Sequence, residues 1–253
     1  MLKLEVLGSS SHGNCSIITD GESSVMIDCG INVDHILPKI NADILDGVII
    51  THSHGDHFKG CNHLASYVNC RFYMNSDCFN KSSIFFMKKV LIESEKMFKV
   101  GNYQIIPFEV YHDVLNYGFI IKHMPSGHKI VWITDSSSYS NLHFNDIDTF
   151  VVEANNSVEW IKDKENVDFK DFRTYSDYGH CSIEDTIIFL KENININTKN
   201  IILCHISYSC DDFREFEVKA RQELDFNNII ALNPKETKIK TISLQKDCDI
   251  NFD

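Results

Sequence analysis

The sequence predicts a layered α/β sandwich that forms one domain. Short β-like runs outnumber helical segments in each half of the chain, and helical segments separate groups of strands. The 253 residues are 43% hydrophobic, which is ample for a buried core. With only four prolines and no repeat or linker-like tract, we expect a single domain over residues 1–253 rather than a strictly alternating βα fold.

The first third of the chain combines short strands with three helices. The expected strands carry alternating or continuous apolar residues and cover 2–8, 15–19, 25–30, 46–50 and 71–74. The expected helices show helical apolar spacing and cover 33–40, 62–68 and 76–92.

The rest of the chain repeats this mixture. Further strands are expected at 103–111, 118–123, 129–134, 148–153, 201–205 and 238–244, and further helices at 183–191 and 212–223. The turn Pro125-Ser126-Gly127 joins two of these strands. Ser182 precedes the helix at 183–191 and Asp185 follows it by three positions, which is a partial capping signal.

Net charge argues against a broad grip on duplex nucleic acid. The 24 Lys+Arg and 36 Asp+Glu residues give a formal charge of −12, and the basic residues are scattered. A phosphate substrate is still compatible with this charge, because bound divalent cations can supply positive charge locally.

The sequence also favours a cytoplasmic protein. No apolar run approaches the roughly 20 residues that a membrane-spanning helix needs, and the N-terminus does not resemble a secretory signal. The nine cysteines are an odd number without C-x-x-C spacing, a pattern typical of reduced thiols rather than of a disulfide framework.

The stretch THSHGDH at residues 51–57 concentrates metal-binding side chains directly after the apolar run 48–50. In an extended loop His52, His54 and Asp56 would project to one side, and a turn at Gly55 would let His57 return. Imidazole suits Zn, Fe or Mn, and a carboxylate can hold or bridge a second cation. The stretch therefore predicts a metal site.

One loop cannot complete two coordination shells, so other strand ends must contribute. Three predicted strands end in suitable residues: His112 with Asp113, then Asp135, then His205. Spacing alone says only that these groups could converge. Asp113 could orient a neighbouring ligand or simply be exposed, and both interpretations stay open.

The pattern His52-Ser53-His54-Gly55-Asp56-His57 resembles the HxHxDH signature of the metallo-β-lactamase superfamily. Within that superfamily the chain is most similar to the YycJ-type branch, because further motifs occur in the same order between residue 2 and about residue 224. These motifs are LGSSSHGNCSII, MIDCG, the pair His112-Asp113, ITDSS, VVEANN, GHCSIED and ILCHIS.

This resemblance implies a four-layer αββα sandwich of the metallo-β-lactamase type, with two divalent metal ions (Zn or Mn, or else Fe) at the sheet edge. It assigns His52, His54 and His112 to one metal and Asp56, His57 and His205 to the other, with Asp135 bridging. It also implies that Asp28 supports the metal loop, that His180 assists at the scissile phosphate, and that the loop around His12 lies near the mouth of the site.

The predicted function is that of a metal-dependent phosphodiesterase acting on nucleic acid, a nuclease. Asp56 or Asp135 would take the proton of the attacking water, while His180 would stabilise the transition state or protonate the leaving group. Two alternatives stay open: hydrolysis of small cyclic nucleotides, and a non-catalytic metal-binding regulatory module. No long insertion resembles a tRNA-gripping arm, and the resemblance allows a homodimer.

Overall fold

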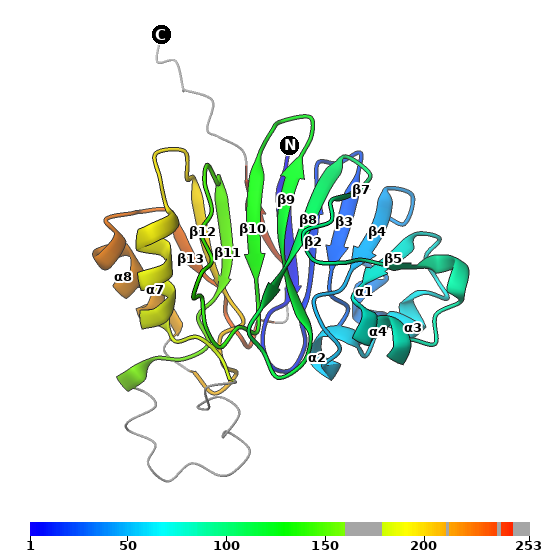
Figure 1. The fold of residues 1–253 in the computed structure, drawn as a ribbon, viewed down its shortest axis with the longest axis horizontal. Helices are drawn as coiled ribbons and strands as arrows, with labels where there is room; N and C mark the ends of the chain where they lie inside the picture. Colours follow the sequence, from blue (N-terminus) through cyan, green and yellow to red (C-terminus); the bar gives the residue numbers. More distant parts are fainter. Residues whose placement is uncertain (160–178, 211–212, 237–238, 245–253) are drawn as a thin grey trace.

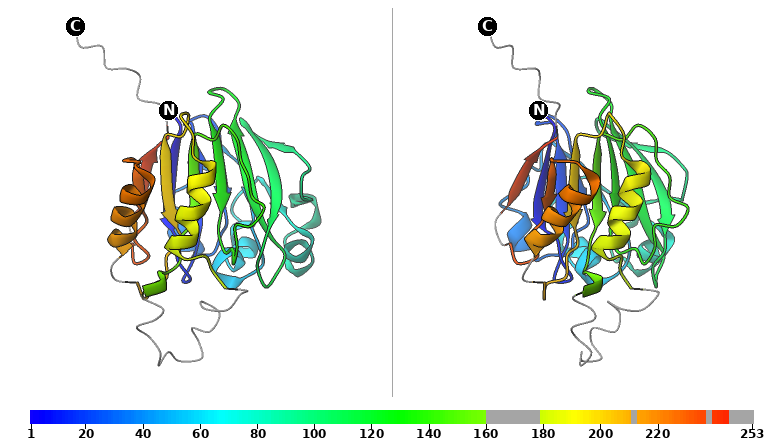
Figure 2. Two further views of the ribbon diagram at one scale, coloured as in Figure 1. Left: turned by 60° about the vertical axis from the view of Figure 1, so that its left-hand side comes forward. Right: turned by 90° about the vertical axis from the view of Figure 1, so that its left-hand side faces the viewer.

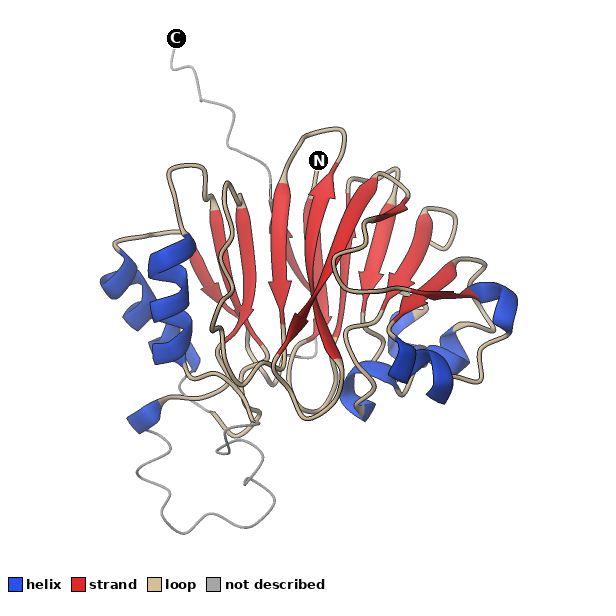
Figure 3. Ribbon diagram, viewed as in Figure 1, coloured by secondary structure: helices blue, strands red, loops and turns tan. Residues whose placement is uncertain are grey.

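Two seven-stranded sheets pack face to face, and helices cover the outer face of each sheet (Figures 1 and 3). The computed structural model describes residues 1–159, 179–210, 213–236 and 239–244. In the left view of Figure 2, α7 (yellow) and α8 (orange) lie together on one side of the molecule and the N-terminal helices (cyan) on the other. The predicted four-layer αββα sandwich is confirmed.

The first sheet gathers the N-terminal strands and closes with the last strand described. Its order is β14-β1-β2-β3-β4-β5-β6. The bounds are β1 Lys3–Gly8, β2 Cys15–Thr19, β3 Ser24–Ile27, β4 Leu45–Ile49, β5 Arg71–Met74, β6 Lys89–Leu91 and β14 Lys240–Ser243. Strands β3 to β6 run parallel to one another.

The second sheet has the order β13-β12-β11-β10-β9-β8-β7. The bounds are β7 Phe98–Val100, β8 Tyr103–Val110, β9 Asn116–His123, β10 Lys129–Ile133, β11 Thr149–Glu153, β12 Asn200–Cys204 and β13 Ile229–Ala231. Strands β10 to β13 are parallel, so their carboxyl ends meet at one edge of the sheet.

The helices are short in the first half and longer in the second. Their bounds are α1 Val33–Ile36, α2 Gly55–Phe58, α3 Cys61–Leu64, α4 Ser76–Lys81, the 3-10 turn η1 Phe86–Lys88, α7 Ile183–Asn193 and α8 Phe213–Leu224. Helix α7 begins with a complete capping box between Ser182 and Asp185, which confirms the capping signal read from the sequence.

Three apolar clusters explain the four layers. Between the sheets, residues such as Ile18, Ile27 and Phe119 form the central core. A second cluster joins α7 and α8 to the outer face of the second sheet, and a third joins α1 and α3 to the outer face of the first. Each sheet is therefore apolar on both faces, as expected where helices cover the outer side.

One long element was predicted wrongly. Residues 76–92 were expected to be one helix, but the chain forms α4, then η1, then the strand β6. Strand β6 pairs with β5. The apolar residues of 76–92 recur at helical spacing, and this spacing does not reveal a pairing with another strand. The sequence also missed β7 and β13, which have three residues each. Residues 212 and 238, the first of the helix and of the last strand that were expected, lie outside the described residues.

Other features bear on the expectations about membranes and thiols. Over the described ranges, the structure has no helix with the length and apolar character to cross a bilayer. The seven cysteines from Cys15 to Cys204 are free thiols, and all are buried, as is Cys210.

Candidate metal centre

The stretch 51–57 leaves β4 and turns back into a single helical turn. Residues 51–54 are irregular, and α2 begins at Gly55, so Asp56 and His57 lie on a helix rather than in the extended loop expected from the sequence. Gly55 does not have a positive φ, and the turn therefore does not depend on a special glycine conformation at this position. His52 and His57 are fully buried.

The first group of metal-binding side chains contains His52, His54 and His112. Their ligand atoms lie within 4.8 Å of one another, and Nε2 of His112 is 3.1 Å from Nδ1 of His54. Nε2 of His52 is buried and has no hydrogen bond partner. A buried ring nitrogen without a partner is costly, and a cation among these rings would remove that cost.

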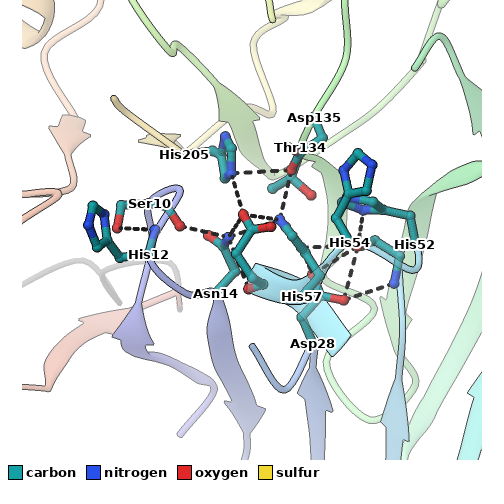
Figure 4. A network of polar contacts seen from close by, with 12 residues as sticks. Ser10, His12, Asn14, Asp28, His52, His54, His57, Thr134, Asp135 and His205 are labelled. Atoms are coloured by element: carbon teal, nitrogen blue, oxygen red, sulfur yellow. Dashed lines mark hydrogen bonds and ion pairs between the residues drawn. The ribbon is translucent and has the colours of Figure 1, made fainter. Parts of the chain in front are cut away.

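The second group contains Asp56, His57, Asp135 and His205, again with ligand atoms within 4.8 Å. Oδ2 of Asp135 lies 2.9 Å from Nε2 of His57 and 3.3 Å from Nε2 of His205. Its other oxygen, Oδ1, lies 3.9 Å from Nε2 of His112 in the first group. The two oxygens of Asp135 therefore face the two groups, which is the geometry that a bridging carboxylate needs. Figure 4 shows Asp135 and His205 on one side of His57.

Asp28 contacts His57 on the side of the ring that faces away from the second group. Its Oδ2 lies 2.7 Å from Nδ1 of His57, and Oδ1 accepts a hydrogen bond of 2.8 Å from the backbone N–H of Thr51. The Thr51 hydroxyl also lies 3.0 Å from Nδ1 of His52. Such contacts fix the tautomer and the orientation of a ring, so that its other nitrogen faces a metal.

Asp113 makes the corresponding contact at the solvent side. Its Oδ1 lies 3.3 Å from Nε2 of His54 and 3.2 Å from Nε2 of His112. The side chain is 39% exposed, so Asp113 contacts the first group from its solvent-facing rim. Of the two interpretations left open by the sequence, these contacts favour the one in which Asp113 orients a neighbouring histidine.

Glu153 is a site residue that sequence analysis did not single out. It ends β11, is fully buried, and its Oε1 lies 2.6 Å from Nδ1 of His180 and 3.0 Å from Nδ1 of His205. Its Oε2 accepts a hydrogen bond of 2.7 Å from the backbone N–H of Ser136. The sequence did contain a signal for this role. Glu153 lies inside the apolar run Val-Val-Glu-Ala, and a glutamate that is buried in such a strand is almost always paired with other polar groups.

Asn14 is a second residue that was missed, although it lies in the quoted LGSSSHGNCSII motif. Its Nδ2 lies 2.9 Å from Nε2 of His57 and 3.3 Å from Oδ2 of Asp56, and it donates to the backbone O of Ser10 at 2.9 Å. Asn14 therefore ties the loop between β1 and β2 to the second group, as Figure 4 shows.

Three site residues have left-handed backbone conformations within two positions of a strand end. The φ angles are 59° at Asp28, 54° at Asp135 and 49° at His205. Residues other than glycine adopt this region at a cost, and they do so most often where a site fixes the direction of the side chain. The strand ends are thus bent in a way that turns their side chains toward one point.

Electrostatics differ between the two groups. Burial lowers the pKa of His52 and His112, so these rings are neutral and ready to donate a lone pair. Burial also opposes protonation of His205, but the carboxylates of Asp135, Asp56 and Glu153 outweigh it and raise its pKa to about 10. The second group therefore carries enough negative charge to hold protons, and a divalent cation would satisfy the same carboxylates. The donor set fits a metal.

Comparison with known proteins supports this description. The family model of the metallo-beta-lactamase superfamily matches residues 10–77, the segment that contains Asn14, Asp28 and the 51–57 stretch. The chain is 28% identical over 220 residues to "Exodeoxyribonuclease YycJ" of Bacillus anthracis, a match that covers 81% of this chain and 83% of the relative. By these matches the chain is similar to proteins of the metallo-beta-lactamase superfamily.

Solved structures share the superfamily's fold with this chain. The metallo-beta-lactamase fold protein YhfI from Bacillus subtilis superposes with a TM-score of 0.73 at 17% identity, covering 95% of this chain and 98% of YhfI. Zn(2+)-bound PqqB from Methylobacterium extorquens gives a TM-score of 0.70 at 13% identity, covering 95% and 99% of the two chains.

The similarity to this superfamily and the His/Asp groups together indicate a metal-dependent hydrolase. The structure brings all seven residues predicted as ligands to one edge of the sandwich, and it places His180 beside them. Their individual roles as ligands and catalytic groups stay predictions.

Proposed function

We propose that the protein is a dinuclear metal-dependent phosphodiesterase that cleaves nucleic acid. The observation that carries the proposal is the position of Asp135, whose two oxygens face two separate groups of histidines. Divalent cations held by these residues would activate water at neutral pH and would neutralise the charge of a phosphodiester.

In this proposal the seven side chains divide into two sets joined by one carboxylate. His52, His54 and His112 would hold one ion, Asp56, His57 and His205 the other, and Asp135 both. These His and Asp side chains can bind Zn, Mn or Fe, and elemental analysis would identify the native ion.

Three residues would handle protons. The carboxylates of Asp56 and Asp135 are the groups placed to accept the proton of the attacking water. Burial opposes protonation of His180, but Glu153 outweighs it and raises the pKa of the ring. Because Glu153 binds Nδ1, the remaining nitrogen Nε2 would stabilise the charged phosphorane or protonate the leaving oxygen.

The relative named an exodeoxyribonuclease supports a nucleic acid substrate. The net charge of −12 disfavours a long electrostatic contact with duplex nucleic acid. It is compatible with a second candidate function, the hydrolysis of small cyclic nucleotides. The two candidates differ in salt dependence, because a polymer releases many counterions on binding and a single phosphate releases few.

A substrate panel tests the proposal. The protein is stripped with chelator, reloaded with Mn or Zn, and assayed on single-stranded DNA, duplex DNA, RNA, cyclic mononucleotides and bis(p-nitrophenyl) phosphate. We expect cleavage of nucleic acid with binding that weakens steeply with salt. Turnover of cyclic mononucleotides alone would establish the second candidate, and a fully loaded protein that cleaves none of these substrates would overturn both.

His180→Ala tests the role of the histidine. We expect kcat on bis(p-nitrophenyl) phosphate to fall by about 10²- to 10⁴-fold, the usual contribution of an acid or base, with metal content unchanged. The matched control is His63→Ala, which removes an exposed histidine of α3 and should leave kcat intact. Equal activities of the two variants would refute the role given to His180.

A further inference from the structure

A second concave site lies next to the candidate metal centre. A pocket of ≈ 660 Å³ opens between the loop that follows β1, the segment around α1, and the loops that follow β12 and β13. Apolar side chains, among them Leu7, Ile31 and Pro234, form part of its lining. None of the residues assigned to the two metal groups lines it, so it is a separate feature of the surface.

An aromatic pair stands at this pocket. The rings of His12 and Tyr208 have centroids 3.9 Å apart with a tilt of 40°, and Nζ of Lys235 lies 5.6 Å from the centroid of Tyr208. Tyr208 is 41% exposed, and His12 is also exposed. A pair of solvent-accessible rings with a nearby ammonium is suited to a flat, electron-rich ligand, which can stack on one face and meet the cation at its edge.

The pocket and the metal centre share their framework. Ser9 and Ser10 line the pocket, and the Ser9 hydroxyl accepts a hydrogen bond of 2.9 Å from the backbone N–H of His205. Ser10 accepts from Asn14, which contacts His57. In Figure 4, His12 lies beyond Ser10 and Asn14 on the side away from His52 and His54. The aromatic pair is thus fixed one short loop from the second metal group.

The charges of the pocket fit a nucleobase better than a phosphate. Lys39 and Lys235 line it together with Asp34 and Glu236, so cations and carboxylates are mixed. Carboxylates would repel a phosphate, but they can accept hydrogen bonds from the ring N–H and amino groups of a base.

We propose that this pocket binds the base of one nucleotide of a single-stranded nucleic acid, whose adjacent phosphate lies at the metal centre. This inference rests on the proposed function and adds that the nucleic acid substrate is single-stranded. Inside a duplex both faces of a base are covered by its neighbours, so a base away from a duplex end can lie against Tyr208 only when it is unstacked. Stacking is tolerant of sequence and does not require a basic surface, which suits an acidic protein with scattered lysines.

Equilibrium binding tests the proposal with the metal-loaded protein. The probe is a fluorescent tetrathymidylate with phosphorothioate linkages that resist cleavage, compared by anisotropy with an abasic chain of the same length. We expect Tyr208→Ala to raise the Kd for the tetrathymidylate by about 5-fold or more, the loss typical of one stacked base, and to leave the Kd for the abasic chain within 2-fold.

Two control variants separate stacking from folding. Tyr208→Phe keeps the ring and should bind the tetrathymidylate like the wild type. Tyr67→Ala removes another exposed tyrosine, 56% exposed and in contact with His63, and should also have no effect. Equal loss for both chains with Tyr208→Ala, or no loss for either, would overturn the proposal. A cyclic mononucleotide that binds as tightly as the tetramer, with the same dependence on Tyr208, would overturn the assignment to a strand.

A parallel hydrolysis assay distinguishes failure of the base pocket from failure of the proposed phosphodiesterase function. Hydrolysis of bis(p-nitrophenyl) phosphate by the wild type, measured in parallel, reports the metal centre alone. Hydrolysis with binding that is indifferent to Tyr208 refutes the base pocket only. Binding that depends on the base and on Tyr208, in a protein that hydrolyses no phosphodiester, refutes the phosphodiesterase only.

Discussion

Oε1 of Glu153 lies 2.6 Å from Nδ1 of His180, and this contact selects the ring nitrogen that is left for a substrate. The same oxygen lies 3.0 Å from Nδ1 of His205, so one buried carboxylate orients a predicted catalytic residue and a predicted metal ligand. Because Glu153 is fully buried, its charge is stable only with these partners. The residue is therefore a positioning group for both.

Glu153→Gln should reduce activity while the fold persists. The amide oxygen can still accept from Ser136, but the side chain no longer carries the charge that favours protonated His180. We expect kcat on bis(p-nitrophenyl) phosphate to fall by about 10- to 100-fold, the range seen when an outer partner of a metal ligand is changed. The kcat and KM values should be measured together with metal content and thermal unfolding.

The control for this change is Glu223→Gln on α8. Glu223 pairs with Lys191 at 2.7 Å on the exposed surface, where such pairs contribute little, so kcat should be unaffected. If Glu153→Gln lowers only the unfolding temperature and leaves kcat unchanged, Glu153 is a structural residue without a positioning role.

Metal removal should destabilise the folded protein. The buried Nε2 of His52 has no hydrogen bond partner, and carboxylates crowd the second group, so the empty centre is a source of instability that bound cations relieve. At free metal near 100 times Kd, we expect a stabilisation of about 2.7 kcal/mol, measured by urea unfolding of stripped and reloaded protein. Asp135→Asn should abolish most of this gain, whereas His63→Ala should retain it. Identical unfolding curves with and without metal would contradict a centre at these residues.

Much of the site could be predicted from the sequence because ligands of this kind follow strands. His112, Asp135 and His205 each follow a predicted strand. Strands β8, β10 and β12 run in the same direction, because β9 is antiparallel to both β8 and β10 and because β10 to β12 are parallel, so their ends meet at one edge. Glu153 escaped prediction because its partner His180 is 27 positions away, and no local pattern marks that contact. Asn14 escaped for a similar reason, since its role depends on contact with the 51–57 stretch.

The errors of the fold prediction have the same origin. Helical spacing is local, and it described α7 and α8 well because those helices bury one continuous apolar stripe against the second sheet. In residues 76–92 the apolar residues also recur at helical spacing, yet Phe85, Phe86 and Met87 are exposed and the following residues pair with β5. The residues of β6 form a strand because they pair with β5, and a single sequence does not reveal which strands pair.

A pH-dependent contact at the opposite end of the sandwich should contribute to stability. Asp20, after β2, accepts hydrogen bonds from Nδ2 of Asn102 at 2.7 Å and from His123, whose Nε2 lies 2.9 Å away. It therefore joins the first sheet to the second. Desolvation acts against the charged form of Asp20, but these hydrogen bonds and those from the backbone of Glu22 and Ser23 outweigh it and lower the pKa of Asp20.

A carboxylate with a lowered pKa stabilises the fold above its unfolded pKa of about 3.9, and this contribution is lost as the pH falls further toward the folded value. Asp20→Asn should thus cost about 1.5 to 3 kcal/mol at pH 7, the net value of hydrogen bonds to a charged group. The difference from the wild type should shrink below about pH 4. Urea unfolding at pH 7, 5 and 3.5 measures it, and a difference that stays constant across this range would show that the charge of Asp20 is irrelevant.

Two glycines near the metal centre should differ strongly in how much stability the same substitution costs. A Cβ added at Gly30 would lie 1.5 Å from the backbone O of Asp56 and 2.6 Å from the backbone N of His57, whereas a Cβ at Gly55 would meet nothing within 4 Å. The close approach at Gly30 is what allows Asp56 and His57 to lie against the end of β3, and backbone atoms cannot move aside as a flexible side chain can.

Gly30→Ala should therefore displace α2 from β3, lower the free energy of unfolding by about 3 kcal/mol or more, and remove metal from the second group. Gly55→Ala should change that free energy by less than about 1 kcal/mol, because Gly55 begins a helix and alanine favours helical backbone. Urea unfolding and elemental analysis of both variants measure the contrast. Similar stability and metal content of the two variants would mean that the close packing of the backbone at Gly30 does not position Asp56 and His57.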